Sequence, residues 1–249
     1  MPYAVLQTDL NPPGLDQMRR AFRSVPGLTP ADAEILGNDA FGILVKDFSE
    51  QQAGALQGAL RVEGIETEIV DQSILPGLPP SHFVRRLDCT PEHLLIYDPL
   101  GRTFALDWPH IIFIAAGAVR LTEFVREQRN PKTRVTSGRY QTPVYIEYEI
   151  KEERQFRCLA EIIITGGALR YSLAAEKFNF SGLGSRILKS VPANFSLLVR
   201  DLVQFGANAR LNRGAEALRE NSTNIFNYPS KNAFYEEIVW TLWQMKKAE

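Results

Sequence analysis

Hydrophobic positions in the first 70 residues switch between a two-residue period and a helical period. Tyr3–Thr8 alternates weakly and predicts a strand. Apolar residues spaced three and four apart predict a helix over Leu15–Ser24. Thr29 as N-cap, with Pro30 in the first turn, predicts a second helix that ends near Gly37-Asn38.

The same alternation of periods continues over residues 41–70. Phe41–Val45 is a continuous apolar run, as in a strand buried on both faces. Ser49 is the expected N-cap of a third helix, which Gly64 ends. Ile65–Val70 alternates and predicts a third strand. Residues 1–72 therefore form a predicted βααβαβ domain.

Residues 73–81 contain three prolines and a glycine and predict a semi-rigid linker. From residue 82 the pattern becomes that of short strands, with Asp98–Gly101 as a tight hairpin turn. The strand candidates are Phe83–Cys89, His93–Tyr97, Thr103–Trp108, Ile111–Val119, Val144–Lys151, Gln155–Ile164 and Ala168–Leu173. Seven strands at short spacing predict a barrel or sandwich within residues 82–249, and the fold class is α+β.

Two helices are predicted after the strands. The first has Pro192 in its first turn and a stripe of apolar residues on one side. The last covers about Ser230–Lys247, and we expect it to pack on the barrel or on the first domain. Its aromatic residues Tyr235, Trp240 and Trp243 are interpreted as core, with a partner-facing surface as the alternative.

The first domain resembles the C-terminal domain of the bacterial ribosomal stalk protein and the related adaptor of the Clp protease. The segments that carry the resemblance are Gly27–Ala31 (GLTPA), Gly42–Val45 (GILV), Ser49–Ala53 (SEQQA) and Val62–Val70 (VEGIETEIV). The resemblance implies protein binding through the second helix and its neighbouring face, which is basic in the stalk protein. Here that helix carries Asp32 and Glu34 and no Lys or Arg, which argues against the same translation-factor partners.

Residues 82–205, with seven predicted strands and then one amphipathic helix, resemble the pleckstrin-homology-like domains of bacteria. The segment that carries this resemblance is residues 95–119 (LIYDPLGRTFALDWPHIIFIAAGAV), with Trp108 followed by Ile111 and Ile112. The resemblance implies binding of phosphoinositides, peptides or other proteins, and rarely catalysis.

Composition narrows the class of function. The chain has 249 residues and a formal net charge of -1, so a general polyanion-binding role is not implied. The longest apolar run is too short for a bilayer, and no secretory signal is visible, so we expect a cytoplasmic protein without a transmembrane segment. Cys89 and Cys158 lack metal-ligand spacing and are expected to be buried reduced thiols.

The best candidate site is a basic segment between two predicted strands. It contains Arg126, Arg129, Lys132, Arg134 and Arg139. In pleckstrin-homology-like domains such a loop commonly binds phosphate, and arginine suits phosphate oxygens. An ordinary solvated loop is the alternative, and the loop lacks the interleaved aromatic residues that single-stranded nucleic acid needs. A second candidate, Phe178–Lys189, has two glycines and several polar residues but matches no phosphate loop, so a plain turn is preferred.

Catalytic motifs are not recognisable in the sequence, and no cofactor is expected. The leading hypothesis is a non-catalytic adaptor or scaffold that binds other proteins. The alternatives are a peripheral membrane or anionic-ligand sensor that uses the basic segment, and an enzyme with an unrecognised site. For an enzyme, Cys89, His93 and Asp107 are the residues to inspect first.

Overall fold

The computed structural model describes residues 1–248 except 12, 40, 129–147, 168 and 221–224. Helices and strands are both abundant, and the mixed α+β class is confirmed. None of the helices in the described part combines the length and the apolarity that crossing a bilayer would require.

The N-terminal unit has its six elements in the predicted order. They are β1 (Tyr3–Gln7), α1 (Leu15–Arg23), α2 (Pro30–Asp39), β2 (Ile43–Phe48), α3 (Glu50–Val62) and β3 (Thr67–Asp71). The strands form an antiparallel sheet in the order β2-β1-β3. Ser49 caps α3 as expected: its hydroxyl accepts the Gln52 amide, and the Gln52 side chain accepts the Ser49 amide.

Both faces of this small sheet are covered. On one face, Val5 and Leu44 pack against Met18 and Phe22 of α1 and against Leu56 of α3. The opposite face carries a second set of buried side chains, Ala4, Leu6, Ile43 and Val70, which pack against Trp243 with Val239 and Trp240 beside it. Those three residues belong to α6 (Lys231–Ala248), so the last helix of the chain completes the core of its first unit.

The remaining strands are divided between two sheets. They are β4 (Ser81–Phe83), β5 (Leu87–Cys89), β6 (His93–Tyr97), β7 (Thr103–Asp107), β8 (Ile111–Gln128), β9 (Tyr148–Ile164), β10 (Arg170–Ala174), β11 (Arg210–Leu211) and β12 (Asn227–Tyr228). The larger sheet has the order β11-β8-β9-β10-β4, with β12 also paired to β8, and the smaller has the order β5-β6-β7. Outside the sheets lie α4 (Val191–Phe205) and α5 (Arg213–Arg219).

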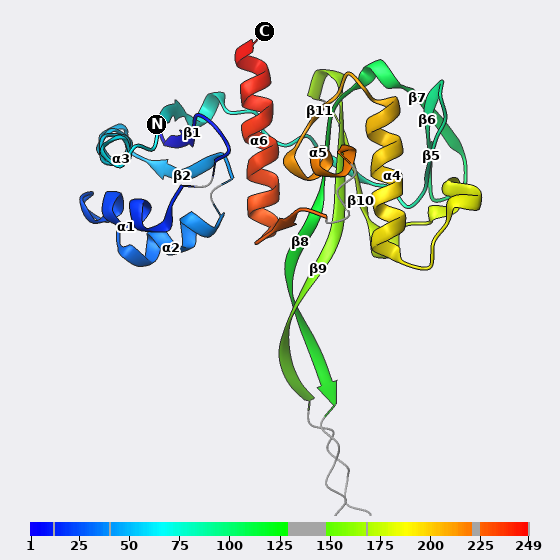
Figure 1. The fold of residues 1–249 in the computed structure, drawn as a ribbon, viewed down its shortest axis with the longest axis horizontal. Helices are drawn as coiled ribbons and strands as arrows, with labels where there is room; N and C mark the ends of the chain where they lie inside the picture. The colour runs from blue at the N-terminus through cyan, green and yellow to red at the C-terminus, as the bar shows by residue number, and fades with distance from the viewer. Residues whose placement is uncertain (12, 40, 129–147, 168, 221–224, 249) are drawn as a thin grey trace, which may run out of the picture.

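Of the predicted barrel or sandwich, the barrel is wrong, because none of the described sheets closes. Phe195, Leu198 and Leu202 of α4 are buried in one core with residues of both sheets, and α4 stands between them (Figure 1). A helix therefore fills the space that strand-to-strand closure would have used. The strands predicted over 144–151 and 155–164 are one long strand, β9, and its ribbon with β8 continues past the rest of the sheet (Figure 1).

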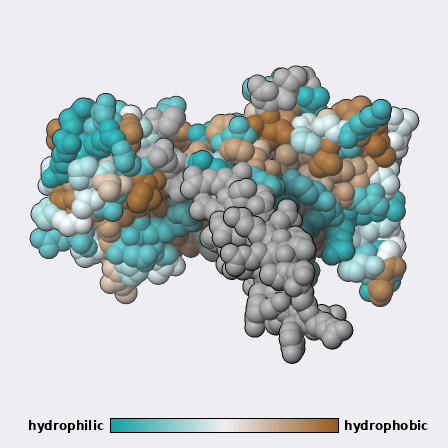
Figure 2. Space-filling model, turned by 90° about the horizontal axis from the view of Figure 1, so that it is seen from below, coloured by the Kyte–Doolittle hydropathy of each residue, from teal (hydrophilic) through white to brown (hydrophobic). Residues whose placement is uncertain are grey.

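Helix α6 stands between the two halves of the protein (Figure 1). Phe234 and Ile238 pack against Phe113 and Ile163 of the larger sheet, while Trp243 packs against the N-terminal sheet. Of the three aromatic residues interpreted as core, Trp243 is buried at 9% exposed, and Tyr235 and Trp240 are partly buried against the same cores. Seen from below, hydrophilic residues cover much of the N-terminal unit, and hydrophobic residues also reach the surface at both ends (Figure 2).

Polar contacts fix α6 on the N-terminal sheet. Trp240 Nε1 donates to the Gln7 carbonyl at 2.7 Å, and Trp243 Nε1 donates to Glu68 Oε1 at 2.9 Å. Gly42 is needed at this contact: its φ is +94°, and a Cβ atom there would lie 2.3 Å from Trp240 Cγ. A side chain at position 42 would therefore push the helix off the sheet.

Substitution Gly42→Ala is expected to lower the free energy of unfolding by about 3 kcal/mol, because it adds left-handed backbone strain to a clash with Trp240. Urea denaturation followed by tryptophan fluorescence measures the change. The matched control is Gly58→Ala in α3, where an added Cβ atom meets nothing within 4 Å. That variant should gain about 1 kcal/mol from helix propensity. Equal effects of the two substitutions would contradict the proposed role of Gly42.

Candidate functional site

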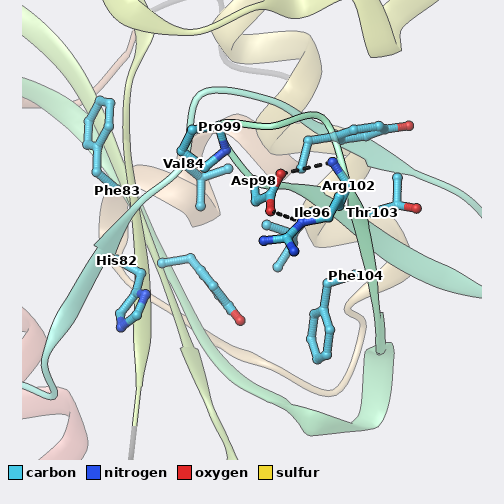
Figure 3. A pocket seen from close by; sticks show the side chains of 11 residues that line it. His82, Phe83, Val84, Ile96, Asp98, Pro99, Arg102, Thr103 and Phe104 are labelled. Carbon is cyan, nitrogen blue, oxygen red and sulfur yellow. Dashed lines mark hydrogen bonds and ion pairs between the residues drawn. The ribbon is translucent and has the colours of Figure 1, made fainter.

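A pocket of about 460 Å³ lies between the β10–β4 edge of the larger sheet and the β6–β7 hairpin (Figure 3). That volume is within the range of small-ligand and side-chain sites. We call it the aromatic pocket and define it by its lining residues: His82, Phe83, Val84, Ile96, Tyr97, Asp98, Pro99, Arg102, Thr103, Phe104 and Tyr171.

One wall comes from the β6–β7 hairpin, whose turn Asp98 holds in shape. Asp98 Oδ1 accepts the amides of Leu100 at 2.8 Å and Arg102 at 2.9 Å. Asp98 Oδ2 accepts Arg102 Nε at 2.6 Å, and this bond to Arg102 is the main reason that the pKa of Asp98 is lowered. The tight turn predicted at 98–101 is therefore present, with Gly101 at φ +79°.

Aromatic residues lie on both walls of the pocket. Ile96 and Phe104 are paired across β6 and β7, so they lie on the same face of the hairpin. On the opposite wall His82 and Tyr171 are paired across β4 and β10, with ring centroids 6.5 Å apart. Phe104 remains 57% exposed and Phe83 49% exposed, which is high for large apolar side chains.

The charges at the pocket are already matched. Asp98 and Arg102 form an ion pair with each other, and burial raises the pKa of the Tyr171 phenol, which therefore stays neutral. A site with aromatic walls and a paired acid and base is chemically suited to hold an apolar side chain. The arrangement offers shape and apolar contact rather than a reactive group.

A buried carboxylate supports the strand pair that forms the His82–Tyr171 wall. Glu161 of β9 is 2% exposed and accepts hydrogen bonds from the hydroxyls of Ser172 and, at 3.1 Å, Tyr235. Arg170 Nη1 lies 3.3 Å from Glu161 Oε1. The Ser172 hydroxyl in turn lies 2.5 Å from that of Ser81 on β4. This network joins β9, β10, β4 and α6 behind the pocket.

The basic segment singled out in the sequence falls mostly outside the described residues. Arg126 lies in β8, where it is paired with Ile150. Arg129, Lys132, Arg134 and Arg139 belong to the undescribed segment 129–147. Phosphate binding by these residues therefore stays a prediction.

The residues considered for an enzyme do not form one set. His93 Nδ1 and Asp107 Oδ1 lie 2.9 Å apart on an exposed part of the β6–β7 hairpin. Cys89 is paired with Leu94, and strand alternation places it on the other face from His93. Burial raises the pKa of the Cys89 thiol well above its ordinary value, and that of Cys158 to about 11, so both thiols stay protonated. Among the described residues no cluster of acidic, His or Cys side chains is arranged to hold a metal ion.

The second candidate from the sequence, Phe178–Lys189, is a packed connection. Phe178 and Phe180 are buried with their ring centroids 5.0 Å apart. Arg186 Nη1 donates to Asp201 Oδ1 at 2.9 Å, so its guanidinium is engaged within the chain. The preference for a plain structural turn fits these contacts.

Sequence analysis missed the aromatic pocket. Phe83 and Phe104 were assigned to strands, but the two strands come from separate sheets and meet only in three dimensions. One hint of the pocket in the sequence is Phe104, which follows the predicted turn at 98–101. It lies in a strand that does not alternate cleanly between polar and apolar residues. Comparison of the chain with protein families, with curated proteins and with solved structures found no match.

Replacement of Glu161 by Gln is expected to change how stability depends on pH. Burial raises the native pKa of Glu161, so the native state binds more protons than the unfolded state between the two pKa values. The unfolding free energy of the wild type should therefore fall as pH rises from the ordinary glutamate range through the raised native value. Glu161→Gln should remove that part of the decline.

Urea denaturation of both proteins at a series of pH values measures this difference. The difference between wild type and variant cancels the titration of other groups. A wild-type advantage that instead grows with pH would mean that Arg170 and the hydroxyl donors outweigh burial, and that the pKa is lowered.

Proposed function

We propose that this protein is a non-catalytic adaptor that binds another protein, and that the aromatic pocket holds an apolar side chain of the partner. The observation that carries the proposal is the half-exposed pair Phe83 and Phe104 at a pocket whose charges are already paired. Exposed aromatic residues beside a preformed cavity are the usual anchors of protein interfaces.

The rigidity of the pocket supports this proposal. The Asp98 turn fixes one wall, and the Glu161 network lies behind the other. A preformed pocket loses little conformational entropy when a partner side chain enters. The partner therefore needs one large aliphatic or aromatic residue presented by a segment that reaches between the hairpin and β4.

The N-terminal unit has a separate place in the proposal. Its likeness to the stalk and Clp-adaptor domains was based on sequence, and we propose that it offers a second protein contact through α2. Ile35 of α2 is 63% exposed, and Asp32 and Glu34 lie beside it. Glu34 is already paired with Arg19, and Asp32 accepts the Thr29 amide, so the exposed Ile35 is the residue that would make this contact.

Removal of residues 1–72 is a poor test of either contact. The N-terminal sheet covers Val239, Trp240 and Trp243 of α6, so the truncated chain would expose these side chains. Such a surface promotes aggregation and non-specific capture. Single substitutions at exposed positions avoid this problem.

The test is capture of partners from the native cell by the tagged chain, compared with the variants Phe83→Ser and Phe104→Ser. A protein captured by the wild type should bind each variant at least about tenfold more weakly, as expected for loss of an anchoring aromatic residue. The matched control is Leu100→Ser, because Leu100 is 79% exposed on the same hairpin but does not line the pocket.

Circular dichroism and thermal unfolding confirm that the variants are folded. Capture that survives both pocket substitutions, or that is lost equally in Leu100→Ser, would contradict the proposal. If no protein is captured at all, the competing hypothesis is the anionic-ligand role of Arg126, Arg129, Lys132, Arg134 and Arg139. Flotation with anionic vesicles then decides that hypothesis.

A further inference from the structure

We propose that two copies of this chain pair through the free edge of β7, forming an antiparallel six-stranded sheet with the strand order β5-β6-β7-β7-β6-β5. The proposal goes beyond the proposed function, because it concerns a second copy of the chain rather than a partner of the pocket. It rests on backbone chemistry, on the lack of protection at this edge and on the exposed phenylalanine at its centre.

The backbone of β7 offers hydrogen-bonding groups on the side away from β6. The Asp98 amide donates to the Arg102 carbonyl at 3.0 Å, so these two residues are a hydrogen-bonded pair. Hydrogen-bonded and non-hydrogen-bonded pairs alternate from there along β6 and β7. The next pair that exchanges hydrogen bonds is then Ile96 with Phe104. The amides and carbonyls of Thr103 and Ala105 are therefore directed outward, where no other strand lies in the described part of the chain.

Other sheet edges of the described structure are protected by familiar means. The edge strand β4 has three residues and directly follows Pro79 and Pro80. The edge of β5 is covered by the segment Phe180–Arg186 and by α4. In the N-terminal sheet, β3 carries Glu68 and Asp71. Short length, proline, covering elements and charge are the devices that prevent edge-to-edge pairing.

The edge of β7 has none of these protections over most of its length. Thr103, Phe104 and Ala105 are all exposed, and Thr103–Leu106 contains no charged residue and no proline. Such an edge is a template for another strand. An exposed phenylalanine in the middle adds apolar surface that pairing would cover.

The charged residues next to the middle of β7 stand at its two ends and are paired within the chain. Arg102 precedes the strand with its side chain 78% exposed, and Asp107 ends the strand with its side chain 58% exposed. Arg102 is paired with Asp98, and Asp107 is paired with His93. Strand alternation places Arg102 on the face of Phe104 and Asp107 on the opposite face, so these end charges leave the middle of the edge open to a second strand.

The exposed aromatic ring selects the register. If Thr103 exchanges hydrogen bonds with Ala105 of the second copy, then Phe104 lies on the two-fold axis opposite the second copy's Phe104. Aromatic residues directly opposite one another stabilise antiparallel strands. Because Phe104 also lines the aromatic pocket, this register places the two pockets on either side of the axis. A five-residue edge buries little area, so the dimer is expected to be weak and concentration-dependent.

Sedimentation velocity over a range from low to high micromolar concentration tests the proposal. The wild type should shift from monomer to dimer, and Ala105→Pro should weaken the dimer at least about tenfold. The Ala105 amide is directed away from β6, so proline removes an edge donor and leaves the β6–β7 ladder intact. Ala105→Thr keeps the donor and is the control, with wild-type association expected.

Hydrogen exchange identifies the surface used. The amides of Thr103 and Ala105 should become more protected as concentration rises, whereas the Phe104 amide, bonded to Ile96 in monomer and dimer, should not change. If Ala105→Pro fails to fold, Ala105→Lys replaces it, because it keeps the backbone donor and places like charges beside the axis.

A wild type that stays monomeric over the whole range would overturn the proposal. So would unchanged dimerisation of Ala105→Pro, or a dimer in which Thr103 and Ala105 are not protected. The result is separable from that of the proposed function, since Phe83→Ser lies on β4 and should dimerise normally whether or not it loses its partner.

Discussion

Burial of α6 on two opposite sides is the constraint on which the rest of the structure depends. The β2-β1-β3 sheet has helices of its own on one face only, and its other face carries Leu6 and Ile43. The larger sheet likewise presents Phe113 and Ile163 to α6. One helix therefore removes two apolar faces from water, at about 25 cal/mol for each Å² of apolar surface. Neither sheet face would be stable if left exposed.

Polar groups restrict the position of α6 more narrowly than apolar contact alone would. Glu237 is fully buried and accepts the Arg213 amide at 2.8 Å, with the Arg213 guanidinium 3.4 Å away. The same guanidinium donates to the Leu10 carbonyl at 3.1 Å and lies 4.6 Å from the centre of the Phe41 ring. Because a buried charge without its partner is costly, this cluster permits few alternative positions for the helix. The two units are thereby held in one arrangement.

Local chemistry made much of the secondary structure predictable. The Ser49 cap, the Gly64 stop and the Asp98 turn depend on neighbouring residues only, and each appears as expected. Strand pairing depends on distant residues, which is why the barrel was wrong. Glu152–Arg154 looked like a break between two strands, but a ribbon can carry polar residues, so β9 runs through them. The aromatic pocket was invisible for the same reason, since β4 and β7 belong to different sheets.

The position of α6 also affects the order in which the chain can fold as it is made. The central strand β1 is synthesised first, whereas the helix that covers one face of its sheet, Lys231–Ala248, is synthesised more than 220 residues later. Domains generally fold as they emerge from the ribosome, at about 5–20 residues per second. During that interval Leu6 and Ile43 have no native cover. One apolar sheet face is thus without its native cover until translation reaches α6, and transiently exposed surface of this kind makes unfinished chains prone to aggregate.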